Sequence, residues 1–316
     1  MVIKMEINDG YMPFKGFKTY YRIVDGGDKT PLICLHGGPG STHNYFEVLD
    51  CIAKTGRKVI MYDQLGCGKS FVEGHDELWN QDTWMEELEA LMEYLNIESC
   101  HLLGQSWGGM LAIAYAIEKK SVRLKSLILS STLSSASLWA KEQHRMISFM
   151  SDDEKQAILS EDYESDQYQL ANEHYMQLHC AGPFDEDTPE CVKREKKAGT
   201  RAYLIGWGPN EYTPLGTLKD FEYTNRLNEI QVPALIISGT NDLCTPLVAK
   251  TMYDGIKNAK WHLMPECRHM CFVDDHDTYC HNLEDWLASV DKNRCFFTCF
   301  EKIGVFLLFK TIFVTH

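Results

Sequence analysis

The heptapeptide Leu103-Gly104-Gln105-Ser106-Trp107-Gly108-Gly109 gives the strongest indication of the fold of this chain. It follows a short apolar run that predicts a strand, and it precedes residues 110–117, which are rich in Ala and Leu and predict a helix. Gly-x-Ser-x-Gly between a strand and a helix is typical of a nucleophile elbow, in which a serine sits on a sharp, strained turn. Gly104 and Gly108 fit this interpretation because glycine tolerates close backbone approach without a steric penalty. Since the pattern also occurs by chance, the remaining sequence decides whether Ser106 is a nucleophile.

Outside this stretch, short β-like runs alternate with amphipathic segments. Six runs are rich in β-branched and aliphatic residues, namely Tyr20–Val24, Pro31–Leu35, Lys58–Tyr62, Leu124–Leu129, Val232–Ser238 and Trp261–Leu263. Strands that alternate with helices favour a mostly parallel sheet with helices on both faces. The sequence therefore predicts an α/β fold.

Two local predictions accompany this pattern. The first two runs flank Asp25-Gly26-Gly27-Asp28, whose composition is typical of a hairpin turn, so these runs are expected to pair with each other. The segment from Thr83 to Glu86 has the form of a capping box. It predicts the start of an amphipathic helix whose core face carries Trp84, Leu88, Leu91 and Leu95.

From residue 134 to residue 225 the β-like runs disappear and charged helical stretches take their place. This change predicts a helical cap inserted into an α/β core that comprises residues 1–133 and 226–294. Residues 295–316 form an apolar C-terminal extension, but charged residues interrupt it before it reaches the ~20 continuous apolar residues of a membrane-spanning helix. We expect a loosely docked extension, with a membrane anchor as the alternative.

Composition restricts the possible partners and the compartment. The 316 residues carry a formal net charge of −14, which argues against nucleic acid and anionic membrane surfaces. The first ten residues contain no apolar signal core. The 12 cysteines show no pairwise metal spacing, and Cys34, Cys100 and Cys180 are expected to be small buried hydrophobic residues. We therefore expect a cytoplasmic protein with free thiols and without a metal or cofactor, and we make no prediction of its oligomeric state.

The run Pro31–Leu35 ends in the glycine-rich loop His36-Gly37-Gly38-Pro39-Gly40. This loop lacks the Lys-Ser/Thr pair of a phosphate-binding loop and the spacing of a dinucleotide fingerprint. A His-Gly-Gly loop at this place in lipases and esterases presents a backbone N–H to a developing oxyanion, which is the interpretation that we favour over a plain tight turn. The segment Asp63–Ser70 also contains Gly-x-Gly and is interpreted as a turn.

A serine nucleophile of this kind needs an acid and then a base later in the chain, each just after a strand. Asp242 follows the run that ends at Ser238, and His269 follows the run that ends at Leu263. Hydrogen-bonded to Asp242, His269 would accept the proton of Ser106 and later return it to the leaving group.

Other ionisable residues compete for these roles. His262 alternates within a strand, and His276 and His281 fall in a predicted helix, so each is interpreted as structural. Asp63 ends a strand but precedes the serine, which is the wrong order for the acid. No His/Cys/Asp cluster in the sequence supports a metal site. Together these elements predict serine hydrolysis.

Four motifs resemble those of a known family. They are His-Gly-Gly-Pro-Gly at 36–40, Asp63-Gln64-x-Gly-x-Gly-x-Ser, Gly-Gln-Ser-Trp-Gly-Gly at 104–109, and Gly-Pro-Asn-Glu at 208–211. With Asp242 and His269 they resemble the proline iminopeptidases, serine peptidases of the α/β-hydrolase superfamily, from about residue 10 to residue 290. The resemblance implies an α/β-hydrolase fold with a helical cap and release of an N-terminal residue from short peptides through an acyl-serine intermediate. It implies that Gly38 and Trp107 form the oxyanion hole and that Glu211 binds the substrate's α-amino group.

One position departs from the family pattern. Some members carry a second amine-binding glutamate directly after the triad aspartate, where this chain has Leu243. An amino-acid amidase, or an esterase or lactonase with the same triad, therefore remains an alternative, as does a non-catalytic binding protein on this fold. The substrate is then a small peptide, amide or ester. Trp107, Tyr203, Trp207 and Tyr212 are expected either to wall a pocket for a small ring or to form the core of the cap.

Overall fold

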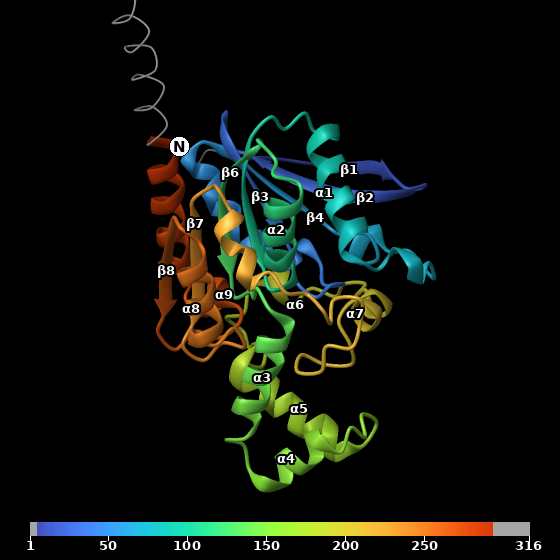
Figure 1. Cartoon of the computed structure of the whole chain (residues 1–316). Helices are drawn as coiled ribbons and strands as arrows, with labels where there is room; N and C mark the ends of the chain where they lie inside the picture. The colour runs from blue at the N-terminus through green and yellow to red at the C-terminus, as the bar shows by residue number, and fades with distance from the viewer. Residues whose placement is uncertain (1–4, 293–316) are drawn as a thin grey trace, which may run out of the picture.

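A computed structural model describes residues 5–292, so the C-terminal extension lies outside the described residues. The strands form one eight-stranded sheet in the order β1-β2-β4-β3-β5-β6-β7-β8, and Figure 1 shows the helices around this sheet. The β1–β2 and β2–β4 pairs are antiparallel, and every other neighbouring pair is parallel. The strands are β1 (Glu6–Phe14), β2 (Phe17–Asp25), β3 (Lys29–Leu35), β4 (Arg57–Tyr62), β5 (Cys100–Gln105), β6 (Leu124–Ser130), β7 (Ala234–Gly239) and β8 (Ala259–Met264). The predicted α/β fold is confirmed.

The helices of the described residues cover the sheet and fill one long connection. They are α1 (Gln81–Tyr94), α2 (Trp107–Glu118), α3 (Ala136–Ile147), α4 (Asp152–Leu159), α5 (Asp166–His179), α6 (Glu190–Lys193), α7 (Thr200–Gly206), α8 (Pro246–Gly255) and α9 (Cys271–Asp274). Residues 276–292 are also helical. The 3₁₀ segments are η1 (His43–Thr55), η2 (Gly68–Ser70), η3 (Asp76–Leu78) and η4 (Thr224–Glu229).

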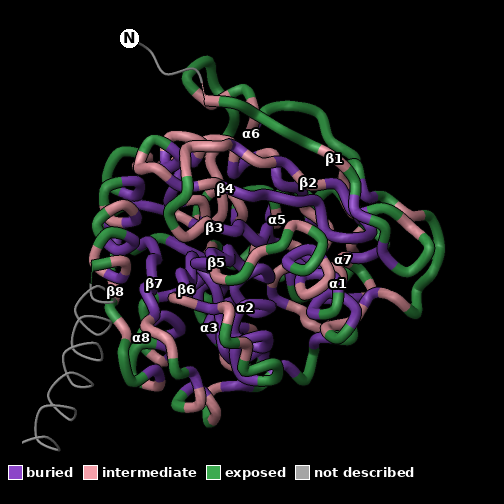
Figure 2. Tube along the Cα trace, turned by 90° about the horizontal axis from the view of Figure 1, so that it is seen from above, coloured by how far each residue is buried: buried purple, intermediate pink, exposed green. Residues whose placement is uncertain are grey.

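Both faces of the central strands are buried, and successive side chains alternate between two apolar layers. In β3, Leu32 and Cys34 join one layer, whereas Ile33 and Leu35 join the other. The first layer contains η1, α9 and the helix 276–292, and the second contains α1, α2 and α8. Figure 2 shows the buried strands between exposed outer segments. A nearly continuous apolar run such as that of β3 is therefore what a strand covered on both faces requires.

The predicted hairpin between the first two runs is wrong. β2 pairs with β1 through a turn at Lys15 and Gly16, and its other edge pairs with β4, while β3 lies between β4 and β5. Both turn residues have positive φ (47° and 82°), as a two-residue turn between twisted strands requires. Sequence analysis missed β1 because its first half is polar and mostly exposed, without an alternating apolar pattern.

The predicted start of α1 is also wrong. The N-cap is Asn80, whose side chain accepts a hydrogen bond from the backbone N–H of Thr83 at 3.0 Å. Asparagine caps helices as well as threonine does, so the helix begins two residues before the predicted capping box. The core face is otherwise as expected: Trp84, Leu88 and Leu91 are buried, and Leu95 forms the C-cap.

Between β6 and β7 the chain leaves the sheet for the five helices α3 to α7. In Figure 1, α3, α4 and α5 lie below the sheet. Ser135, Ser151 and Ser165 cap these three helices by accepting backbone N–H bonds, so the predicted helical stretches each have a defined start. The division into a core (1–133 and 226–294) and a cap (134–225) is our interpretation of this excursion.

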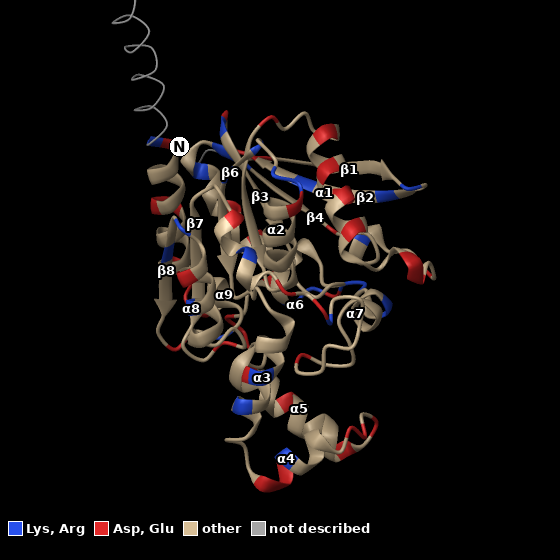
Figure 3. Ribbon diagram, in the orientation of Figure 1, with Lys and Arg blue, Asp and Glu red and all other residues tan. Residues whose placement is uncertain are grey.

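Charged residues are distributed over many elements rather than gathered on one face (Figure 3). The first turn of α4 carries three acidic residues, Asp152, Asp153 and Glu154, which suits the positive end of the helix dipole. Within residues 5–292, none of the helices combines the length and the apolarity that crossing a membrane requires.

Candidate active site

Ser106 occupies the turn between β5 and α2. Its backbone has φ 55° and ψ −124°, an unfavourable conformation for a residue with a side chain. A Cβ on Gly104 would lie 2.2 Å from the carbonyl oxygen of Gly108, and one on Gly108 would lie 1.9 Å from that of Leu35. The two flanking glycines are therefore required by close backbone contacts, and the strain at Ser106 is held by the packed strand and helix on either side.

Asp242 and His269 are in direct contact. Asp242 lies three residues after β7, and its Oδ1 accepts a hydrogen bond from Nδ1 of His269 at 2.7 Å. The same carboxylate accepts the backbone N–H groups of Cys244 (2.8 Å) and Gly239 (3.2 Å). Both side chains are almost fully buried. Because the carboxylate fixes the proton on Nδ1, Nε2 of the neutral ring is left as a proton acceptor.

A cavity of about 390 Å³ brings distant parts of the chain together. Ser106, His269 and Glu211 all line it, as does Gly38 of the glycine-rich loop. The volume is within the usual range for sites that bind small molecules. The fold thus gathers a hydroxyl, an imidazole and a carboxylate around one space.

The loop after β3 is held against the elbow by hydrogen bonds. The backbone N–H of Gly37 donates to the hydroxyl oxygen of Tyr45 at 2.6 Å, and that hydroxyl donates to Oε1 of Gln105 at 2.9 Å. Gly38 has φ +111°, which favours glycine. Trp107 is the first residue of α2, where a backbone N–H has no partner within the helix.

Gln64 joins this loop to the elbow, a contact that sequence analysis missed. Its side-chain amide donates to the carbonyl oxygen of His36 at 2.9 Å and accepts from Nε1 of Trp107 at 2.7 Å. Its backbone N–H donates to Nε2 of His36 at 2.9 Å. Burial lowers the pKa of His36 to about 4, so the ring stays neutral and accepts this bond. The position of Gln64 two residues after β4 was the available signal.

Glu211 is enclosed beside the cavity. Its Oε1 accepts a hydrogen bond from the hydroxyl of Tyr203 at 2.8 Å, and its backbone carbonyl accepts from Nε1 of Trp139 at 2.8 Å. Burial raises the pKa of Glu211, although the Tyr203 hydrogen bond opposes this effect. The Trp139 ring also packs edge-on against His269, with centroids 5.9 Å apart. Trp139 of α3 therefore contacts both Glu211 and His269.

The position after Asp242 contributes no acid. Leu243 is fully buried, and its backbone bonds to the carbonyl of His179 and to the side chain of Gln143. Among the described residues that line the cavity, Glu211 is the only carboxylate and Lys196 is the only Lys or Arg.

The aromatic residues and cysteines that the sequence singled out lie partly at the cavity and partly in the core. Of the four aromatic residues expected to wall a pocket, only Tyr203 lines the cavity, and Trp107, Trp207 and Tyr212 are core residues. Cys180 is partly exposed and lines the cavity, so its predicted burial is only half right, whereas Cys34 and Cys100 are buried.

The rejected ionisable residues lie apart from His269. Asp63 accepts hydrogen bonds from the backbone and the ring of His43. His262 is exposed on β8, and His276 and His281 lie in the helix 276–292.

The chain is similar to known proteins over most of its length. A family model described as alpha/beta hydrolase fold matches residues 30–276. A proline iminopeptidase of Clostridioides difficile is 58% identical in an alignment of 293 residues that covers 91% of this chain and the whole of that protein. A proline iminopeptidase of Lactiplantibacillus plantarum is 54% identical over 89% of this chain and all of its own.

A solved structure gives the same result. The crystal structure of a proline iminopeptidase of Mycobacterium smegmatis superimposes with a TM-score of 0.81 at 27% identity. The match covers 91% of this chain and 100% of that one.

Proposed function

The chain belongs to the proline iminopeptidases within the α/β-hydrolase family, and from that premise we propose that it releases N-terminal proline from short peptides by acyl transfer to Ser106. It is a serine-hydrolase aminopeptidase. The observation that carries the proposal is the single cavity in which Ser106 and His269 face the same space as the enclosed carboxylate of Glu211.

The proposed acyl-transfer step uses Ser106 and His269, which line the same cavity, and Asp242, which is bonded to His269. Oγ of Ser106 attacks the carbonyl carbon of the first peptide bond while Nε2 of His269 takes the hydroxyl proton. Asp242, bonded to Nδ1 at 2.7 Å, keeps the ring in the required tautomer and stabilises the imidazolium that forms. The proton then passes to the leaving amine, and water hydrolyses the acyl-serine by the same steps.

The oxyanion is assigned to two backbone N–H groups, those of Gly38 and Trp107. Preformed donors of this kind stabilise charge that develops in the transition state and need no reorganisation at that moment. Gln64 supports the assignment because it links the His36 carbonyl on one side to the Trp107 ring on the other. It therefore ties the glycine-rich loop, which contains Gly38, to Trp107 at the start of α2.

Glu211 is assigned to the free α-amino group of the substrate. An enclosed ammonium is costly unless it meets a carboxylate, and a charge-assisted hydrogen bond offsets that cost. Because Glu211 and Ser106 line the same cavity, a substrate whose free amine lies near the scissile bond places one group on each of them. This arrangement supports removal of a single N-terminal residue.

The esterase and lactonase alternatives share every element except the need for Glu211, whereas an amino-acid amidase also uses Glu211 and differs in the leaving group. Some family members have a second acidic anchor at the position of Leu243, and because this chain lacks it, the alternative activities are included in the experiment below. We also propose a cytoplasmic location, which the free thiols of the ten described cysteines support.

A substrate panel tests the proposal. Rates are compared for proline p-nitroanilide, its N-acetylated form, free prolinamide and p-nitrophenyl acetate, with Ser106→Ala as the blank. The proposal expects the free-amine anilide to exceed the blocked one by about two orders of magnitude in kcat/KM. Equal rates on the free and blocked anilides would exclude an aminopeptidase, and a preference for the acetate ester would favour the esterase.

A further inference from the structure

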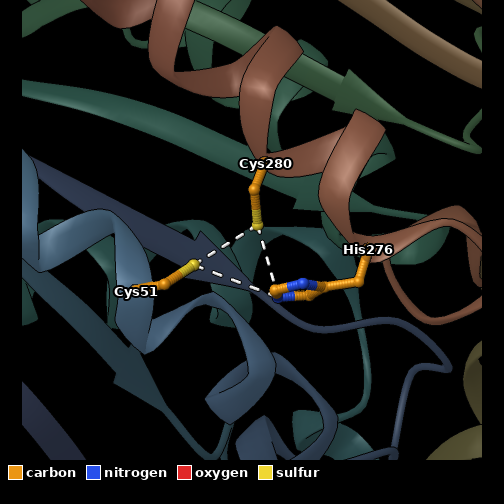
Figure 4. Close-up of side chains that lie close together, drawn as sticks. All are labelled: Cys51, His276 and Cys280. Carbon is orange, nitrogen blue, oxygen red and sulfur yellow. Dashed lines mark hydrogen bonds between the residues drawn. The ribbon is translucent and has the colours of Figure 1, made fainter.

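Three side chains with metal-binding atoms converge away from the active site: Cys51 of η1, and His276 and Cys280 of the helix 276–292. Sγ of Cys51 lies 3.3 Å from Sγ of Cys280 and 3.9 Å from Nε2 of His276, and Sγ of Cys280 lies 3.4 Å from the same nitrogen. Figure 4 shows the three side chains pointing toward one another across the gap between the two elements.

No His/Cys cluster was predicted from the sequence, whereas the structure brings three such side chains together. His276 and Cys280 are four residues apart, which places them on one face of a helix. Cys51 is more than two hundred residues away in the chain, so no sequence spacing reveals it. The contact exists because η1 and the helix 276–292 pack in the same apolar layer against the sheet.

The separations are close to those of a tetrahedral zinc site. Zinc binds cysteine sulfur at about 2.3 Å and histidine nitrogen at about 2.0–2.1 Å. At the corners of a tetrahedron with those bond lengths, two sulfurs lie roughly 3.8 Å apart, and a sulfur and a nitrogen lie roughly 3.6 Å apart. The observed separations are 3.3 Å between the sulfurs and 3.4 and 3.9 Å from sulfur to nitrogen, so side-chain shifts of about half an ångström or less complete the geometry. A donor set of two sulfurs and one imidazole also binds zinc in preference to hard cations such as Mg²⁺.

We propose that Cys51, His276 and Cys280 bind one zinc ion, with water as the fourth ligand. Binding releases the two thiol protons to solvent, and each thiolate and the imidazole then donate an electron pair to the metal. Cys51 and His276 are partly exposed while Cys280 is buried, so an ion and a water reach the site from outside.

The second ring nitrogen of His276 is placed to support this binding. Nε2–H of His276 donates to the carbonyl oxygen of Val48 at 2.9 Å. To bind zinc, the ring releases this hydrogen bond and turns Nε2 toward the two sulfurs. The proton then moves to Nδ1, which lies 3.4 Å from Oδ1 of Asp277. Histidine ligands of zinc commonly donate their other N–H to a carboxylate in this way.

The site joins η1 to the helix 276–292, and none of its three residues lines the catalytic cavity. The ion therefore acts as a clamp on the layer behind the sheet rather than as a Lewis acid in the reaction. Any ligand that binds the folded chain alone raises its thermal midpoint. Zinc should thus stabilise the protein while peptidase activity persists without it.

The test uses the full-length chain, stripped of metal and kept reduced. Zinc is titrated against a chromogenic chelator, bound metal is measured by elemental analysis, and Co²⁺ serves as a spectroscopic substitute. We expect one zinc per chain, a higher Tm with zinc, and a thiolate-to-cobalt charge-transfer band. The variants Cys51→Ser, His276→Gln and Cys280→Ser should each weaken zinc binding by about a hundredfold or more.

The control is Cys191→Ser, a partly exposed cysteine outside the cluster, which should bind zinc like the parent chain. Labelling of Ser106 by a fluorophosphonate checks that each variant is folded; Cys51 and His276 are partly exposed, so their variants remain informative if Cys280→Ser does not fold. Absence of stoichiometric binding would overturn the proposal, and so would equal binding by the three variants and the control. A reduced chain that binds no zinc but forms a Cys51–Cys280 disulfide on oxidation would show a redox pair instead.

Discussion

Replacing Glu211 by glutamine removes one charge and little else. The glutamine carbonyl still accepts the Tyr203 hydroxyl, and Trp139 bonds to the backbone of residue 211, so both neighbouring contacts persist. What is lost is the carboxylate partner of an enclosed substrate ammonium. Hydrogen bonds to charged groups contribute about 1.5–3 kcal/mol, and breaking a buried ion pair costs about 3–5 kcal/mol.

A loss near 3 kcal/mol corresponds to roughly two orders of magnitude in kcat/KM. The assay compares Glu211→Gln with the parent chain on proline p-nitroanilide and on p-nitrophenyl acetate, which has no amine. We expect a fall of about a hundredfold on the anilide and less than about threefold on the ester. Glu186→Gln, an exposed acid in the same connection between β6 and β7, is the matched control and should change neither rate.

The pH dependence gives an independent check. Because burial raises the pKa of Glu211, its carboxylate loses its charge on acidification earlier than an exposed glutamate does. The kcat/KM of the parent chain on the anilide should therefore fall on the acid side, and Glu211→Gln should lack that part of the profile. Equal losses on the anilide and the ester would refute the assignment of Glu211 to the amine.

Three further predictions concern the framework. Gln64→Ala should lower kcat by about tenfold to a hundredfold with little change in KM, because it frees the His36 loop and the Trp107 ring without touching the substrate; a change in KM alone would contradict this. Gly108→Ala should lower Tm strongly and abolish activity, since its Cβ would lie 1.9 Å from the carbonyl oxygen of Leu35; near-parental thermal melting would be contrary evidence. Burial raises the pKa of Glu87 from its ordinary 4.5 to about 8, so the stability contributed by its protonated side chain is present below pH 4.5 and is lost as the pH rises to about 8. The Tm of Glu87→Gln relative to the parent should therefore increase from about pH 5 to about pH 9. A Tm difference that stays constant with pH would contradict this prediction.

Sequence alone was sufficient for the parts of the site that lie at strand ends. Ser106, Asp242 and His269 each follow a β-like run, and in a parallel sheet the carboxyl ends of the strands share one edge. Their proximity could be expected without knowing the strand order. The elbow glycines were predictable for a similar reason, because their steric demand is local to one turn.

Contacts that depend on which elements become neighbours were beyond the sequence. Gln64 bridges the loop after β3 and the start of α2 only because β4, β3 and β5 are adjacent in the sheet. Cys51 meets Cys280 because two helical segments share one layer. The pairing of β2 was mispredicted because a Gly-Gly turn describes local backbone freedom and carries no information about which strands pair.

In the proposed reaction Ser106 becomes covalently bonded to the acyl group, His269 transfers the proton, and Asp242 orients His269. The most direct measurement is peptide mapping of the chain after reaction with a fluorophosphonate, with proline p-nitroanilide hydrolysis followed in parallel. We expect one adduct per chain on Ser106, with activity lost in proportion to labelling. An adduct at another residue, or full activity in a fully labelled chain, would contradict it.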